Sequence, residues 1–180
     1  ERAPMLEPRL RALRAAGVNL GIISKSTEGT IRDSLAAAGL EKLFDAPVLG
    51  KAVGFEGKVG FIDDMARDGA LRILNTRSVG PEQRLQAAAH RVLLVDDDVR
   101  ELERARERGL QVYAAPPDGG LQDRDFEVIL AAVRLPPARA ARPATTNVRP
   151  RGRWDQALFP MKPAGKWRNL IIFSGECFDG

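Results

Sequence analysis

The chain of 180 residues contains very little cysteine and histidine. Its single cysteine, Cys177, cannot form a disulfide within the chain, and this favours a reducing, intracellular setting. His90 is the lone histidine, so neither a zinc site of histidines and cysteines nor a Ser-His-Asp site is expected.

Long apolar runs are also missing. No segment approaches the roughly 20 residues needed to cross a bilayer, and no secretory signal pattern opens the chain. We therefore predict a cytoplasmic protein without a membrane partner. The first residue is Glu1 rather than methionine, which predicts a fragment or a processed product.

The formal charge of +4 is unevenly distributed. Residues 134–153 hold six arginines and no acid, which leaves 22 basic and 24 acidic residues elsewhere. The body of the protein is therefore not a basic surface for nucleic acid. Any attraction to nucleic acid would come from the Arg-rich segment. The alternative interpretation of this segment is a solvated spacer.

Patterns typical of strands and helices alternate from residue 5 to residue 134, which favours an α/β domain with a parallel sheet. Within it, residues 50–60 read as a glycine-rich loop and 65–75 as a helix. Residues 135–153 are rich in Arg, Pro and Ala and predict a linker. The tail, residues 154–180, becomes apolar again; it could dock on the domain or begin another unit.

One stretch is especially informative for chemistry. Four apolar residues, 92–95, predict a buried strand, and Asp96, Asp97 and Asp98 follow at its end. Ligands of parallel α/β sheets bind at the carboxyl ends of the strands, and clustered carboxylates suit Mg²⁺. A single Asp could instead cap the next helix.

In their order along the chain, these segments resemble the haloacid-dehalogenase-like (HAD) superfamily of phosphohydrolases over about residues 6–133. Residues 17–26 are similar to its second motif, an apolar strand that ends in Ser or Thr. Residues 92–95 with Asp96-Asp97 are similar to its fourth motif. Ser24-Lys25-Ser26-Thr27 and the Asp pair are closest to its small magnesium-dependent phosphatases. The implied fold is a HAD-like Rossmannoid parallel sheet with flanking helices.

The resemblance implies an Mg²⁺-dependent phosphohydrolase that acts on a phosphoprotein or a small phosphate ester through an aspartyl-phosphate intermediate. Phosphoryl transfer requires that the charge on the phosphoryl oxygens be positioned and neutralised. Small hydroxyls, lysines and carboxylates at the strand ends could do this. The implied phosphate-binding and catalytic residues are Ser24, Lys25 and Lys58, with Lys51 as the alternative lysine, and the implied metal site is Asp96, Asp97 and Glu101.

The first motif of the family is missing. It places a nucleophilic Asp, and an acid/base Asp two residues later, at the end of the central strand. No strand precedes Glu7, Asp63-Asp64 lacks the spacing, and Ser174 follows an apolar run without a carboxylate there. We therefore expect that the chain begins downstream of this motif and lacks its central strand. Such a fragment would be inactive alone and would leave sheet edges unpaired.

Two other functions remain open. One is a catalytically inactive, phosphatase-like binding module, for which the first motif would be genuinely absent. The other is a signalling receiver domain, because Val-Leu-Leu-Val-Asp-Asp-Asp is also how such domains begin. A receiver needs a phospho-accepting Asp some 40 residues later, and that region is the Pro/Arg linker around residue 137.

Overall fold

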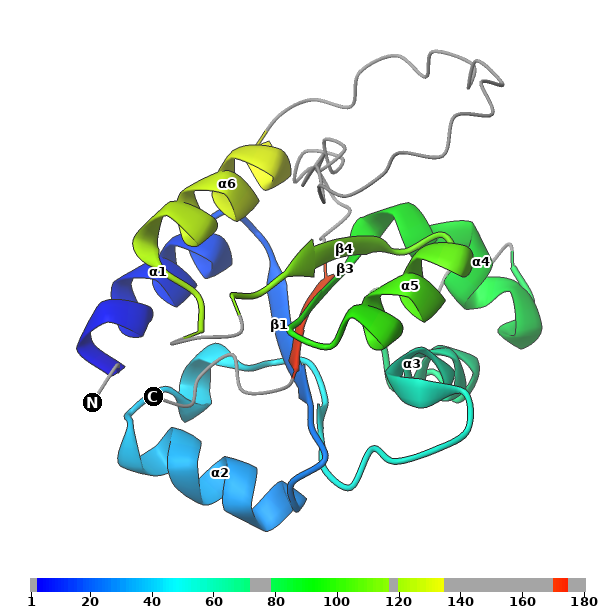
Figure 1. Cartoon of the computed structure of the whole chain (residues 1–180), viewed down its shortest axis with the longest axis horizontal. Helices are drawn as coiled ribbons and strands as arrows, with labels where there is room; N and C mark the ends of the chain where they lie inside the picture. The colour runs from blue at the N-terminus through cyan, green and yellow to red at the C-terminus, as the bar shows by residue number, and fades with distance from the viewer. Residues whose placement is uncertain (1–2, 72–78, 117–119, 135–169, 175–180) are drawn as a thin grey trace.

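A computed structural model describes residues 3–71, 79–116, 120–134 and 170–174 of the chain. Strands and helices form a parallel α/β sheet flanked by helices, as the alternating pattern predicts (Figure 1). Its five strands run in the spatial order β2-β1-β5-β3-β4. They are β1 (Asn19–Ile23), β2 (Val48–Leu49), β3 (Val92–Asp96), β4 (Gln111–Ala114) and β5 (Leu170–Ser174).

The central strand of this sheet is β5, from the C-terminal end of the chain. It pairs in parallel with β1 on one side, where Ile23 lies opposite Ser174, and with β3 on the other, where Val95 lies opposite Phe173. The expectation of a missing central strand was therefore wrong. Of the expected tail, residues 170–174 lie within the domain, where the slot between β1 and β3 pairs both edges of this strand and buries its four apolar side chains.

Helices cover both faces of the sheet. Figure 1 shows α1, α2 and α6 on one side and α3, α4 and α5 on the other. The bounds are α1 (Ala3–Ala15), α2 (Glu28–Ala37), α3 (Gly57–Arg67), α4 (Arg84–Ala88), α5 (Val99–Glu107) and α6 (Asp123–Arg134), with short 3₁₀ turns at Glu41–Leu43, Pro81–Gln83 and Ala89–Arg91. None of the helices in the described residues is long and apolar enough to cross a membrane.

The side chains of β5 join two hydrophobic cores. Ile171 and Phe173 pack with the core under α1, α2 and α6, whereas Leu170 and Ile172 pack with the core under α3, α4 and α5. All four are at most 2 % exposed. This alternation follows from the period of two in a strand, and it explains why a strand buried on both faces is apolar at successive positions.

The segment between β2 and β3 differs from the sequence prediction. Helix α3 begins at Gly57, inside the expected glycine-rich loop of residues 50–60, and ends at Arg67. The expected helix over 65–75 is therefore wrong at its start, and residues 72–75 lie outside the described part. Glycine weakens a helix, so local propensity favours a loop here; packing against α5 overrides it.

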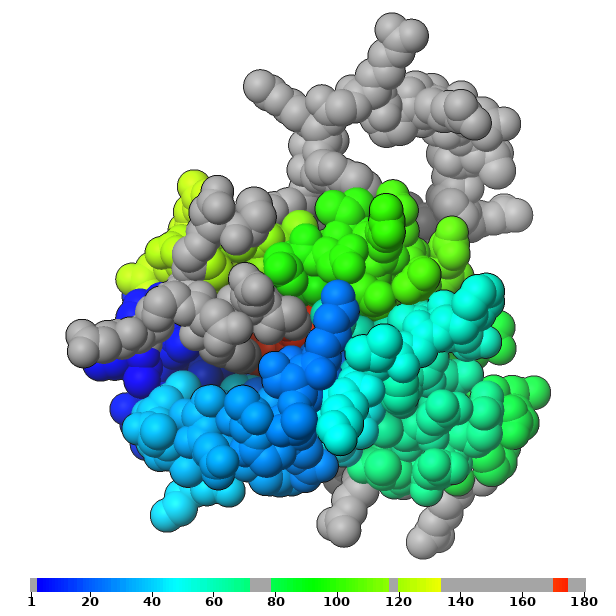
Figure 2. Space-filling view, turned by 60° about the horizontal axis from the view of Figure 1, so that its bottom comes forward, coloured from blue at the N-terminus to red at the C-terminus, as the bar shows by residue number. Residues whose placement is uncertain are grey.

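Two loops meet on one face of the domain. The segment before α2 and the segment after β2, drawn in blue and cyan, lie side by side in Figure 2. The N–H of Lys51 donates to the carbonyl of Ser26 at 2.7 Å, and a Cβ at Gly50 would lie 2.1 Å from the nitrogen of Glu28. Glycine at position 50 therefore permits this close approach. The expected linker, residues 135–153, is outside the described residues.

Candidate functional site

Three neighbouring strands end together at the carboxyl edge of the sheet. Ser24 follows β1, Ser174 ends β5, and Asp96 ends β3. Adjacent strands lie about 4.8 Å apart, so Ser24 and Asp96 flank β5 at roughly twice that spacing. This edge is where ligands of parallel α/β sheets bind.

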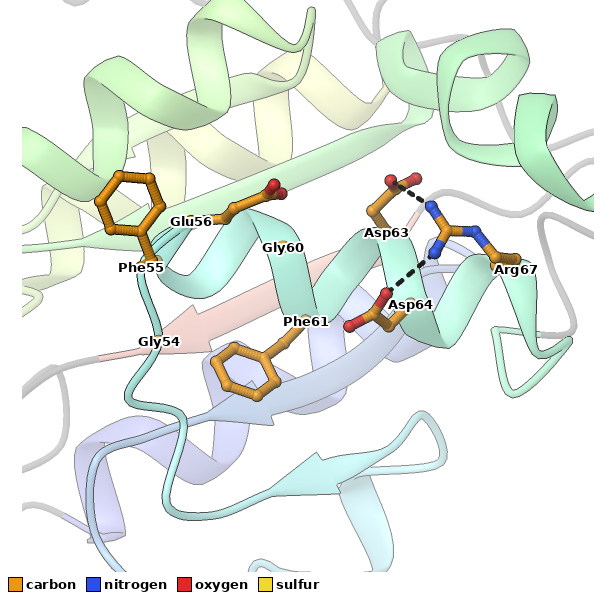
Figure 3. Close-up of a pocket in the computed structure, with 9 residues that line it drawn as sticks. Gly54, Phe55, Glu56, Gly60, Phe61, Asp63, Asp64 and Arg67 are labelled. Atoms are coloured by element: carbon orange, nitrogen blue, oxygen red, sulfur yellow. Dashed lines mark hydrogen bonds and ion pairs between the residues drawn. The ribbon is translucent and has the colours of Figure 1, made fainter.

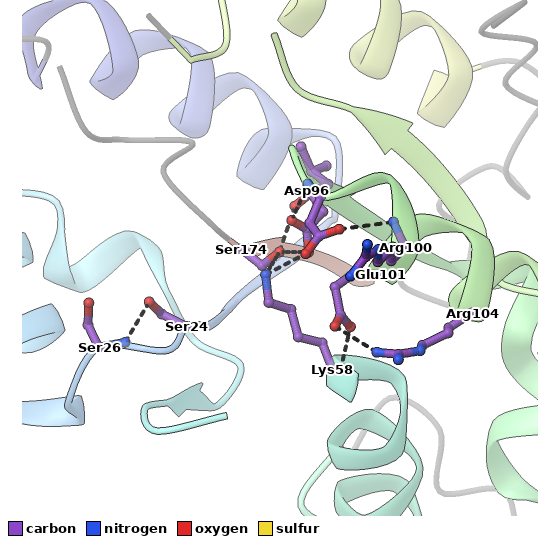
Figure 4. Close-up of polar contacts among 10 residues, drawn as sticks. Ser24, Ser26, Lys58, Asp96, Arg100, Glu101, Arg104 and Ser174 are labelled. Atoms are coloured by element: carbon purple, nitrogen blue, oxygen red, sulfur yellow. Dashed lines mark hydrogen bonds and ion pairs between the residues drawn. The ribbon is translucent and has the colours of Figure 1, made fainter. Parts of the chain in front are cut away.

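Lys58 joins two of these strand ends. Its ammonium nitrogen Nζ lies 2.7 Å from Oδ2 of Asp96 and donates to Oγ of Ser174 at 3.1 Å (Figure 4). The Ser174 hydroxyl also contacts Asp96 Oδ2 and lies 3.2 Å from the carbonyl oxygen of Val95. A cation, a carboxylate and a hydroxyl therefore meet at the centre of the edge.

These three groups are buried. Asp96 is 0 % exposed, and Lys58 and Ser174 are each 2 % exposed. A buried charge is costly unless it is paired and hydrogen-bonded, and here each charge has the other as its partner. Electrostatic interactions are also stronger in such a setting than in water, because the local dielectric is low.

The aspartates after β3 have different environments. Asp98 caps α5, because its Oδ1 accepts from the N–H of Arg100 at 3.0 Å. Its own N–H donates to Oδ1 of Asp96 at 3.0 Å. Asp97 is half-buried, and its carboxylate makes no hydrogen bond or ion pair with the described residues. The capping role considered for one aspartate therefore belongs to the third, while the second can meet a ligand.

Glu101 faces α3 rather than the aspartates. Its Oε2 accepts from the backbone N–H of Lys58 at 2.6 Å, and its Oε1 accepts from Nη1 of Arg104 at 3.1 Å. The described residues contain no cluster of three or more His, Cys, Asp or Glu side chains that could hold a metal. Of the expected metal site, Asp96 and Asp97 therefore lie together at the strand end, and Glu101 is already engaged.

The Ser24 loop lies on the other side of β5. Oγ of Ser24 accepts from the N–H of Ser26 at 3.2 Å, and Thr27 caps α2 by accepting from the N–H of Thr30. Lys25 is exposed. A hydroxyl and a flexible cation therefore border the edge opposite Asp96.

The two candidate lysines have different places. Lys58 reaches the strand ends, whereas Lys51 lies exposed on the loop beside Ser26. Lys51 has a φ of 54°, a left-handed conformation that is uncommon outside glycine. The hydrogen bond from its N–H to the carbonyl of Ser26 holds this conformation. Lys51 therefore lies at the border of the site and not at its centre.

A separate hollow lies along α3 and the segment that precedes it (Figure 3). Its volume is about 330 Å³, and it holds the ion pairs of Arg67 with Asp63 and Asp64. Phe55 at its rim is 99 % exposed. Its lining does not include the Lys58 side chain or the strand ends, and consists of Gly54, Phe55, Glu56, Gly57, Gly60, Phe61, Asp63, Asp64 and Arg67.

Sequence reasoning missed Ser174 as a site residue. The apolar run of residues 170–173 was visible, but the absence of a carboxylate after it removed Ser174 from consideration. The signal that could have found it is that run, which is apolar at consecutive positions and so typical of a central strand.

Comparison of the chain with protein-family models, with curated proteins and with solved structures finds no match.

Proposed function

We propose that this chain binds phosphate esters at the carboxyl edge of its sheet, as a HAD-like phosphatase-type domain. The observation that carries the proposal is the ammonium of Lys58, held between Asp96 and Ser174 where three parallel strands end. A phosphoryl group needs fixed cations and hydrogen-bond donors around its oxygens, and this edge offers both.

The bordering loops supply further contacts. The Ser24 hydroxyl can donate to one phosphoryl oxygen, and the exposed ammonium groups of Lys25 and Lys51 can neutralise charge from the solvent side. Two exposed lysines beside the edge of the sheet suit a phosphorylated small molecule or a phosphoprotein. Lys58 supplies the buried charge at the centre.

Mg²⁺ fits this donor set in part. The half-buried carboxylate of Asp97 offers a hard oxygen ligand, and Mg²⁺ commonly binds one or two carboxylates and keeps several waters. Asp96 lies beside it, but it is fully buried and both of its oxygens already accept hydrogen bonds. Bound there, Mg²⁺ would neutralise charge on the phosphoryl oxygens. Glu101 is not part of this proposed site, because both of its oxygens are engaged.

The identity of the residue at the end of the central strand distinguishes a hydrolytic function from a binding function. Hydrolysis through an aspartyl phosphate needs an aspartate at the end of the central strand. The resemblance to the HAD superfamily implies that this aspartate lies in sequence outside this chain. β5 already fills the slot between β1 and β3, and it ends in Ser174. An external strand would have to displace it. This favours the second candidate, a phosphatase-like module that binds phosphate esters without turning them over.

The receiver-domain alternative has less support. Receiver domains begin with the strand that carries the aspartates, but here β1 and β2 precede β3 in the chain and lie in the same sheet.

Two measurements test the proposal. Calorimetric titration with orthovanadate, a phosphate analogue, in the presence of Mg²⁺ should show binding to the native chain. Ser24→Ala should weaken it by about ten- to a hundredfold, the loss of one hydrogen bond to a charged group. Ser34→Ala, an exposed serine on α2, is the matched control. Absence of binding by the native chain would contradict the proposal.

Release of p-nitrophenol from p-nitrophenyl phosphate, with and without Mg²⁺, separates the two candidates. No Mg²⁺-dependent release, together with orthovanadate binding, is the expected result for the binding module. Mg²⁺-dependent release that disappears in Asp97→Asn would instead establish the phosphohydrolase.

A further inference from the structure

Helix α3 has no cap of its own. Glu56 at its N-cap position makes no side-chain hydrogen bond to the helix, and its first turn contains no acidic residue. The first N–H groups of a helix lack partners within the helix and need acceptors from elsewhere. One acceptor comes from α5, where Oε2 of Glu101 receives the N–H of Lys58, 43 residues away in the chain.

The capping carboxylate is held in place. Glu101 is only 7 % exposed, and Arg104, one turn further along α5, donates to its other oxygen (Figure 4). A negative charge at the N-terminus of a helix is favourable, because the helix dipole is positive there. The Glu101–Arg104 pair therefore fixes where the first turn of α3 can lie.

Gly57 makes this contact possible. Its φ is +64°, and a Cβ at this position would lie 2.4 Å from Oε2 of Glu101 and 2.7 Å from Nη1 of Arg104. Any larger residue would push the carboxylate away. Glycine at position 57 thus serves both the left-handed backbone and the close approach of α5.

Lys58 is consequently held at both ends by one segment of the chain. Asp96, at the end of β3, binds its ammonium, and Glu101, in the first turn of α5, binds its backbone N–H. We propose that Glu101 is a positioning residue, which fixes the first turn of α3 so that the Lys58 ammonium reaches Asp96 and Ser174. This inference rests on the proposed function in one respect, since it takes Lys58 as the cation that binds phosphate.

A cap that serves stability alone makes a different prediction. Its removal would lower the melting temperature but leave the Lys58 ammonium on Asp96, because that contact is itself buried and paired. A positioning residue, when removed, releases the ammonium in the folded protein. The accessibility of Lys58 therefore distinguishes the two roles.

The experiment is competitive acylation of amines in the full-length chain, with labelling of each lysine followed by mass spectrometry. In the native protein, Lys58 should label far more slowly than the exposed Lys25 and Lys51. Glu101→Ala should raise the Lys58 rate about tenfold relative to those two, through easier local opening. Glu101→Gln keeps an acceptor oxygen and should stay within about threefold of native. Glu103→Ala, exposed on the same helix, is the control.

Circular dichroism accompanies each variant. If Glu101→Ala does not fold, Arg104→Ala loosens the carboxylate without removing it, and it should raise Lys58 labelling about threefold, with the exposed Arg100→Ala as control. Native protection of Lys58 in whichever variant folds would overturn the proposal. So would equal exposure of Lys58 in Glu101→Gln and Glu101→Ala.

Orthovanadate titration of the same variants separates this inference from the proposed function. Weaker binding in Glu101→Ala, restored in Glu101→Gln, supports both. If the native chain binds no orthovanadate while Lys58 labelling follows the expected order, the phosphate site fails and the positioning role stands.

Discussion

The ammonium of Lys58 and the hydroxyl of Ser174, 116 residues apart in the chain, lie 3.1 Å apart at the centre of the sheet edge. One comes from the first turn of α3 and the other from the last residue of β5. Their contact ties the C-terminal strand to the domain that precedes it. The site and the completion of the fold therefore depend on the same strand.

The first prediction concerns the central strand. Phe173→Ala should lower the free energy of unfolding by about 3–5 kcal/mol, because it removes a fully buried ring and leaves a cavity. Phe55→Ala makes the same chemical change at a position 99 % exposed and should stay within about 0.5 kcal/mol of native. Urea unfolding measures both. Equal effects would mean that β5 does not pack at the centre.

The second prediction concerns the buried ion pair. Lys58→Met should destabilise the fold by about 3–5 kcal/mol, because it leaves the carboxylate of Asp96 buried without its cation. Adding Asp96→Asn should recover part of that loss, since the unpaired charge is removed. Denaturant unfolding of the single and double variants gives the coupling. Additive effects would contradict a direct pair.

The third prediction uses the only tyrosine. Burial raises the pKa of Tyr113 well above its usual value near 10, and the hydrogen bond from its hydroxyl to Asp125 raises it further. A raised folded-state pKa stabilises the fold fully below pH 10, and that contribution is lost as the pH rises above the unfolded value. Absorbance at 295 nm should show tyrosinate near pH 10 in urea, but only at higher pH in the native chain.

A native titration of Tyr113 near pH 10 would contradict its burial against α6. Tyr113→Phe should reduce the alkaline loss of stability above pH 10, and the difference from the native chain isolates the contribution of the tyrosine from that of other groups.

The fourth prediction concerns Mg²⁺. Asp97→Asn should weaken Mg²⁺ binding measured by calorimetry about tenfold or more, because it removes the one carboxylate at the strand end without a partner among the described residues. Asp68→Asn, an exposed aspartate at the end of α3, should bind Mg²⁺ like the native chain. Equal affinities in the two variants would remove Asp97 from the proposed metal site.

Local patterns predicted much of this fold from sequence. The apolar run of residues 92–95 predicted a buried strand, and the structure has β3 there. A helix cap was the alternative interpretation of the aspartates beside a metal site, and Asp98 is such a cap. The alternation of strands and helices predicted the parallel sheet. These features were predictable because their causes lie within a few residues of one another.

Contacts between distant residues were beyond such patterns. The start of α3 depends on Glu101, 43 residues away, and sequence reasoning placed a loop there. β5 fills the centre of the sheet because β1 and β3 leave two edges for it, a relationship that no local pattern contains. For the same reason, the contact of Glu101 with α3 was not foreseen, and Glu101 was predicted only as a metal ligand.

Mapping amide chemical-shift changes in ¹⁵N-labelled protein, on addition of orthovanadate with Mg²⁺, tests the central claim most directly. The account predicts that the largest changes fall at Ser24, Lys58 and Asp97, around the end of β5, while α6 and the last turn of α3, which holds Asp64 and Arg67, stay unchanged. Changes confined to that last turn, or no changes at saturating orthovanadate, would contradict it.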